Sequence, residues 1–190
     1  MGVVASPSFR NDGQKPVALS KRRRGRHTGA MQIRPATAHD DDAIWRIIGP
    51  VIASGETYAL PRDWTRNEAL AYWRAPGHAV FVAEDNGAVV GTYYMQANQR
   101  GGGAHVANCG YVTAAEATGR GVARAMCVHS LEIARAHGFR AMQFNLVVST
   151  NERAVQLWER CGFAVVGRLP GAFDHPRLGL VDALVMYRAL

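Results

Sequence analysis

One stretch of the chain, residues 110–126, limits the possible folds more than any other. It reads GYVTAAEATGRGVARAM: a strand end, a glycine-rich turn and an alanine-rich helix start. The first N–H groups of a helix have no partner within the helix and sit at its positive end, which suits a phosphate. Small residues at 119, 121 and 123 let an anion approach that backbone closely. The stretch therefore predicts an α/β protein in which the turn is either an anion site between a strand and a helix or a plain connection between the two.

The rest of the sequence supports a single α/β domain over residues 31–190. Apolar periodicity and capping signals predict four helices, at 40–53, 65–74, 121–137 and 151–161. Seven strands are expected, at 32–36, 80–84, 89–96, 105–112, 141–148, 163–167 and 180–187. Asn86-Gly87 is a strong hairpin signal between the second and third strands. The segment 168–179, rich in Pro, Gly and His, is expected to be a loop.

The positive charge of the chain is concentrated at its N-terminus. Residues 1–30 carry seven basic side chains and one acidic, a net +6, whereas the other 160 residues carry fifteen basic and fourteen acidic, a net +1. This segment has no apolar periodicity, so we expect a disordered basic tail. Two interpretations of it stay open: a solvated tail with no role, or a segment that binds nucleic acid through its cluster of arginines.

Composition also bears on location and cofactors. No apolar run reaches the roughly 20 residues that span a bilayer, and residues 1–30 lack the apolar core of a signal peptide. The three cysteines, Cys109, Cys127 and Cys161, are odd in number and far apart. This favours reduced thiols in a cytoplasmic protein, without a disulfide framework. No spacing of His, Cys, Asp or Glu predicts a metal site.

A second segment, residues 151–163, reads NERAVQLWERCGF. Together with residues 118–123, TGRGVA, it resembles the GNAT superfamily of acetyltransferases, whose first motif is Gln/Arg-x-x-Gly-x-Gly/Ala. The family's second signature falls on Asn151, Ala154, Trp158, Gly162 and Phe163. The resemblance covers residues 31–190. It implies one GNAT domain with a mixed sheet of about seven strands, flanked by about four helices and splayed between the fourth and fifth strands.

The resemblance further implies acetyl-CoA as the co-substrate, with no metal. The pantetheine arm would lie in the splay and pair with the backbone near Tyr111 and Val112, and the amides of 119–124 would hold the pyrophosphate. An amine would then attack the acetyl group directly, without an acyl-enzyme. The residues expected to bind acetyl-CoA are Tyr111, Val112, Thr118, Gly119, Arg120, Gly121, Val122, Ala123, Arg124, Asn151 and Trp158.

Two positions depart from the family pattern. Thr118 stands where the motif has Gln or Arg, so one phosphate contact is weaker or comes from Arg120. Trp158 stands where many members place a tyrosine that protonates the leaving thiolate, and an indole N–H is no useful acid near neutral pH. The thiolate would take its proton from water or from Tyr111, or leave unprotonated.

The segments 107–110 and 144–151 resemble a narrower group, the acetyltransferases of azetidine-2-carboxylate and small amino acids. In that group the counterparts of Asn108 and Asn145 contact the acceptor or orient its attack. An Asn within an apolar strand is costly unless its amide is satisfied, so Asn145 is either a ligand contact or a bridge across the splay. The resemblance makes Glu84 a candidate water-relayed base, with a solvated hairpin residue as the equal alternative, and it places Glu56 and Tyr58 on the acceptor side.

Three functions remain open from the sequence. The first is transfer to the amino group of a small molecule, such as an amino or imino acid. The second is a protein or peptide N-acetyltransferase, although the loops at 54–64 and 168–179 favour a small, closed pocket. The third is a non-catalytic CoA-binding module whose tail binds nucleic acid. Asn151 is also interpreted as a plain helix cap. His175 is a candidate titrating group in the late loop. A homodimer is expected because dimers are common among relatives.

Overall fold

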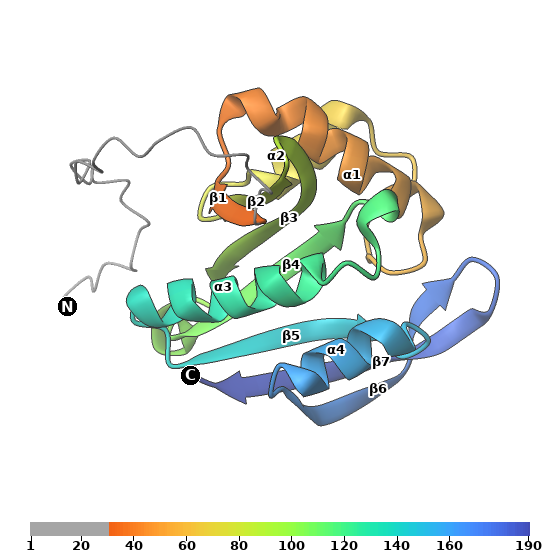
Figure 1. The fold of residues 1–190 in the computed structure, drawn as a ribbon. Coiled ribbons are helices and arrows are strands. Elements are labelled where there is room, and N and C mark those ends of the chain that lie inside the picture. The colour runs from red at the N-terminus through yellow and green to blue at the C-terminus, as the bar shows by residue number, and fades with distance from the viewer. Residues whose placement is uncertain (1–30) are drawn as a thin grey trace.

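A computed structural model describes residues 31–190, so the expected basic tail lies outside the described residues. Figure 1 shows one sheet with helices packed against it. The seven strands lie in the order β1-β2-β3-β4-β5-β7-β6. They are β1 (Gln32–Pro35), β2 (Ala79–Asp85), β3 (Ala88–Ala97), β4 (Val106–Thr113), β5 (Ala141–Val148), β6 (Ala164–His175) and β7 (Gly179–Ala189).

Four α-helices flank this sheet: α1 (Asp41–Ser54), α2 (Arg66–Trp73), α3 (Val122–Ala136) and α4 (Glu152–Arg160). Thr65 caps α2 with a capping box to Glu68, as its sequence indicates. The described residues also form three short 3-10 helices: η1 (Ala38–Asp40), η2 (Gly101–Gly103) and η3 (Ala115–Ala117). The single-domain, mixed-sheet fold class predicted from the sequence is confirmed. Within the described residues, no helix has the length and apolarity to cross a membrane.

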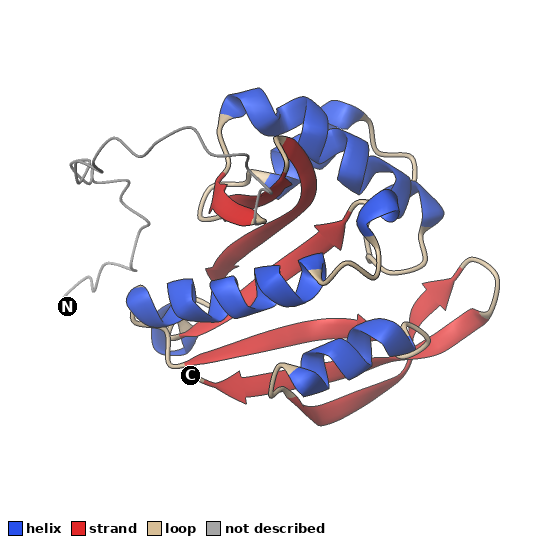
Figure 2. Ribbon diagram, viewed as in Figure 1, coloured by secondary structure: helices blue, strands red, loops and turns tan. Residues whose placement is uncertain are grey.

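The helices cover opposite faces of the sheet, because side chains alternate along a strand. Tyr93 of β3 points to one face, where its hydroxyl hydrogen-bonds to His129 of α3 at 2.8 Å. Its neighbour Thr92 points to the other face and accepts a hydrogen bond from the indole of Trp73 in α2 at 3.1 Å. Figure 2 shows α3 and α4 along the front of the sheet. We call this the α3/α4 face, and the opposite one the α1/α2 face.

The sheet opens between its fourth and fifth strands. Strands β4 and β5 run parallel but pair only at Val106–Ala141 and Ala107–Met142. On its other edge, β4 stays paired with β3 from Ala107 to Thr113. The two strands therefore separate after Ala107, and Figure 1 shows them diverging. The predicted splay is present, and we refer to it as the gap.

The prediction of a loop at 168–179 is wrong for most of its length. Strand β6 continues to His175 and pairs with β7 as far as Gly179, with a register shift between Leu169 and Phe173. Pro170 is tolerated there because β6 is the edge strand and the irregularity spares it a ladder hydrogen bond. His175, expected in a loop, is buried.

Candidate functional site

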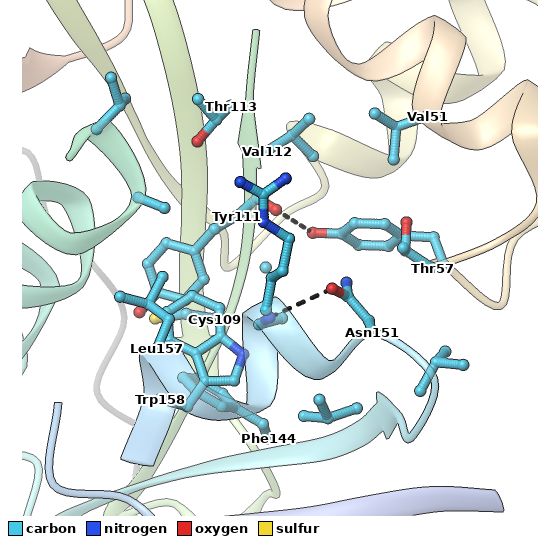
Figure 3. Close-up of a pocket in the computed structure, with 18 of the residues that line it drawn as sticks. Val51, Thr57, Cys109, Tyr111, Val112, Thr113, Phe144, Asn151, Leu157 and Trp158 are labelled. Carbon is cyan, nitrogen blue, oxygen red and sulfur yellow. Dashed lines mark hydrogen bonds between the residues drawn. The ribbon is translucent and has the colours of Figure 1, made fainter. Parts of the chain in front are cut away.

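A cavity of about 910 Å³ occupies the gap. Its walls come from the segment 57–60, from β4 and β5, from the turn and first residues of α3, and from α4. Figure 3 shows Tyr111, Leu157 and Trp158 on one side and Val51 and Thr57 on the other. The cavity thus begins at the N-terminus of α3 and passes between the two separated strands.

The α3/α4 side of the cavity is an aromatic layer. The ring of Trp158 lies 5.0 Å from that of Tyr111 and 5.1 Å from that of Phe144, centroid to centroid. The Tyr111 hydroxyl pairs with Ser130 of α3 at 2.6 Å. Burial raises the pKa of Tyr111 well above its usual value. This hydroxyl therefore belongs to the packed layer rather than to the cavity.

The α1/α2 side is built around Gly110. A Cβ atom added there would lie 2.5 Å from Cε1 of Tyr94 and 2.9 Å from the hydroxyl of Tyr58. Glycine at this position lets the two tyrosines lie directly on the backbone of β4. Two tyrosines thus cover the strand at the point where the gap opens.

The backbone of β4 supplies hydrogen-bonding groups to the gap. Alternate residues of a strand direct their N–H and C=O groups to opposite edges. The carbonyl of Val106 accepts from the Asn98 amide, so Val106 and every second residue after it direct their N–H and C=O groups to β3. The residues between them, which include Cys109, Tyr111 and Thr113, direct their N–H and C=O groups to the gap. In agreement, the Tyr58 hydroxyl donates to the carbonyl of Tyr111 at 3.1 Å, a contact drawn in Figure 3.

At the other end of the cavity lies the turn into α3. Gly119 and Gly121 have φ values of +82° and +81°, in the left-handed region that favours glycine. A Cβ at either position would meet nothing within 4 Å, so the surface above the turn is open. Val122, Ala123 and Arg124 open the helix and line the cavity. The first amides of α3 therefore face open space that suits an anion.

Two asparagines hold the edges of the gap. Nδ2 of Asn108 donates to the carbonyl of Gln143 at 2.9 Å, one residue beyond the last β4–β5 pair. Asn145 is exposed, and its Nδ2 donates to Oδ1 of Asn98 at 2.6 Å. Asn145 is therefore not a buried amide, and the cost of burying an unsatisfied asparagine does not apply to it. Asn108 bridges β4 directly to β5, whereas Asn145 links β5 to the connection after β3.

This difference predicts unequal costs of substitution. Asn108→Ala leaves the Gln143 carbonyl without its donor and is expected to lower the free energy of unfolding by about 1–2 kcal/mol. Asn145→Ala removes only an exposed contact and should change it by less than about 0.5 kcal/mol. Urea denaturation of both variants measures the two values. Equal losses would contradict the assignment of Asn108 as the bridge.

The structure brings most of the predicted residues into the cavity wall. Those that line it are Tyr58, Asn108, Tyr111, Val112, Thr118, Gly119, Gly121, Val122, Ala123, Arg124, Asn145, Asn151 and Trp158. Asn151 also caps α4, since its side chain accepts from the Ala154 amide at 3.2 Å. A cap and a place in the wall are compatible at this position.

Three predicted residues lie outside the wall, each in an ion pair. Glu84 pairs with Arg34 at 2.9 Å, and Arg34 also pairs with Asp40. Arg120 pairs with Asp85, the residue that follows Glu84. Glu56 pairs with Arg177, at the tip of the β6–β7 hairpin, at 2.8 Å. The geometry therefore gives Glu84 no access to the cavity as a base.

Sequence reasoning missed several lining residues. Tyr72 and Tyr94 reach the cavity from α2 and β3, and only the assembled sheet brings them beside Gly110. Arg153, Leu157 and Arg160 have the helical spacing that places residues on one side of α4, and this signal is present in the sequence. With Arg124, Arg153 and Arg160 are the charged side chains of the wall as the structure describes it, and all three belong to α3 or α4. Across residues 31–190, no three His, Cys, Asp or Glu side chains are grouped to hold a metal.

Comparison with known proteins agrees with this arrangement. The sequence model of the acetyltransferase (GNAT) family matches residues 44–163. The chain is 29% identical to N-acetyltransferase aca1 of Schizosaccharomyces pombe over 154 residues, 70% of this chain and 72% of that one.

Solved structures share the fold. A GCN5-related N-acetyltransferase from Kribbella flavida superposes with a TM-score of 0.80 at 43% identity, over 85% of this chain and 98% of that chain. The acetyltransferase yncA from Salmonella typhimurium, described with its cofactor acetyl-CoA, superposes with a TM-score of 0.75 at 23% identity, over 85% and 95% of the two chains. The chain is an acyltransferase that belongs to the GNAT family of acetyltransferases.

Proposed function

We propose that this protein transfers the acetyl group of acetyl-CoA directly to the amino group of a small molecule. The observation that carries the proposal is a single cavity running from the open N-terminus of α3 into the gap between β4 and β5. The yncA relative, described with acetyl-CoA, supports the choice of co-substrate.

The residues present fit the phosphates of acetyl-CoA. The left-handed turn at Gly119 and Gly121 leaves the first α3 amides open, and Arg124, Arg153 and Arg160 supply positive charge nearby. The gap-facing N–H and C=O groups of Thr113, which lies between Tyr111 and the turn into α3, suit the amides of the pantetheine arm. We also assign contacts with the pantetheine arm to Trp158 and Asn151. Trp158 lines the gap from α4, and Asn151 lines it from the cap of that helix.

Direct attack by the amine is favoured over an acyl-enzyme. Cys109 is the thiol in the wall, and burial raises its pKa to about 12. It is therefore a protonated, weak nucleophile at neutral pH. The gap-facing N–H of Tyr111 is positioned to donate to the developing oxyanion. Because the Tyr111 hydroxyl is held by Ser130, we assign protonation of the leaving thiolate to water.

The acceptor end favours a small molecule over a protein. Tyr58 and Tyr94 cover β4 at Gly110, so the strand is not an open groove along which a peptide can lie. The tip of the β6–β7 hairpin meets the segment after α1 through the Arg177–Glu56 pair.

The proposal is tested by thiol release from acetyl-CoA with the full chain and a panel of acceptors. The panel contains azetidine-2-carboxylate, proline analogues, phosphinothricin, simple amines, polyamines and several peptides. We expect turnover with at least one small amine and none with the peptides. Turnover on peptides alone would identify a peptide acetyltransferase. Acetyl-CoA binding without turnover on any amine would favour a non-catalytic CoA-binding protein.

A further inference from the structure

The acceptor end of the cavity has a distinct chemistry. We define the acceptor half as the lining residues on the α1/α2 side of the gap together with the two gap-edge asparagines: Val51, Thr57, Tyr58, Ala59, Leu60, Tyr72, Tyr94, Asn108 and Asn145. None of these side chains carries a charge at neutral pH. We propose, on the basis of the proposed function, that the natural acceptor is an amine without a carboxylate or other anion beside its amino group.

The first support is that the Tyr58 hydroxyl and one N–H of each of the two carboxamides already donate to protein acceptors. The Tyr58 hydroxyl donates to the Tyr111 carbonyl at 3.1 Å. The carboxamides of Asn108 and Asn145 donate to the Gln143 carbonyl and to Asn98 at 2.9 and 2.6 Å. The hydroxyl and carboxamide oxygens keep lone pairs, which accept from the N–H groups of an amine.

The second support is a cluster of aromatic rings behind the acceptor half. The Tyr72 and Tyr94 hydroxyls share one hydrogen bond at 3.2 Å. Tyr94 stacks on His78 at 4.3 Å and meets Trp73 edge-on at 4.9 Å. Burial lowers the pKa of His78, so this imidazole is neutral at neutral pH. This ring cluster therefore brings no positive charge to the acceptor half that could pair with an anion.

The third support is the position of the cations. In the wall that residues 31–190 form, the charged side chains are Arg124, Arg153 and Arg160, which belong to α3 and α4 and not to the acceptor half. Arg177 comes close to the acceptor half, because it pairs with Glu56, the residue before Thr57. That pairing occupies it, and neither partner lines the cavity. A carboxylate on the acceptor would lose its water without gaining a partner, which is costly.

Matched pairs of acceptors test the inference. Thiol release is measured with phenethylamine against phenylalanine, and with azetidine against azetidine-2-carboxylate. Each pair is followed from neutral to alkaline pH and compared per concentration of free amine, so that differences in amine pKa do not enter. We expect kcat/KM to be at least about 10-fold higher for the member without the carboxylate.

A gained cation provides the converse test. Thr57→Lys places an ammonium group in the acceptor half and should reduce the preference for the uncharged member by about 10-fold. Ala53→Lys adds the same charge at an exposed residue outside the wall and should leave the preference unchanged.

The outcomes separate this inference from the proposed function. Equal or faster turnover of the carboxylate members overturns the inference and leaves the acetyltransferase activity standing. The inference is likewise overturned if Thr57→Lys and Ala53→Lys show the same preference for the acceptor without a carboxylate. No thiol release with either member of any pair, in a protein that still binds acetyl-CoA, overturns the proposed function and the inference with it.

Discussion

Gly121→Val is expected to raise the Kd for acetyl-CoA by about 30- to 150-fold, equivalent to about 2–3 kcal/mol. Gly121 caps α3 with a φ of +81°, a conformation that strongly disfavours a β-branched residue. Relief of that strain would shift the first amides of the helix, and the added methyl groups would project above the open turn. The shifted amides and the projecting methyl groups would each remove charge-assisted hydrogen bonds to the phosphate. Isothermal titration calorimetry with acetyl-CoA measures the change.

The matched control for this substitution is Gly138→Val, at the opposite end of the same helix. Gly138 has a φ of +80°, and a Cβ there would also meet nothing within 4 Å. The two variants should thus lose similar amounts of stability, while only Gly121→Val weakens acetyl-CoA binding. Unchanged affinity in Gly121→Val, or an equal loss in Gly138→Val, would contradict the phosphate site at the start of α3.

Trp158→Ala is expected to lower the free energy of unfolding by about 3–5 kcal/mol. The Trp158 side chain is buried against Tyr111 and Phe144, and its removal would leave a void in the layer that forms one wall of the cavity. Trp45→Ala is the control, because Trp45 is half-buried on α1 and lies outside the wall. Urea denaturation should show a clearly smaller loss for that variant.

Trp158→Phe separates packing from chemistry at the same position. Phenylalanine keeps much of the aromatic contact but has no N–H, so we expect kcat to stay within about threefold of the original. A fall of about 100-fold or more, in a protein that still binds acetyl-CoA, would show that the indole N–H takes part in the transfer. That result would contradict the assignment of thiolate protonation to water.

Much of the fold could be predicted because its signals are local. The glycines at 119 and 121, the hairpin at Asn86-Gly87 and the capping box at Thr65 each dictate a backbone conformation over a few residues. The extension of β6 through Pro170 could not be predicted in this way. A proline argues against a strand unless the strand is known to be at an edge, and that position is fixed only by the order of the assembled sheet.

The predicted site residues line the cavity where they follow one another along the chain, and less often where their position depends on pairing. Residues 118–124 are contiguous, and all but Arg120 line the cavity. The roles of Glu84 and Asn145 depended on what lies beside them. Glu84 is paired with Arg34 from β1, and Asn145 is exposed because β5 has no β4 neighbour beyond Met142. A local sequence pattern reveals neither the ion-pair partner of Glu84 nor the exposure of Asn145.

The most direct test of the central claim follows the acetyl group itself. The full chain is incubated with acetyl-CoA that carries a deuterated acetyl group and with the most active small amine of the panel, and the products are analysed by mass spectrometry. We predict one labelled amide on the amine for each thiol released, with no label on the protein. Label found only in free acetate or on a cysteine, or no thiol release at all, would contradict direct transfer in the gap between β4 and β5.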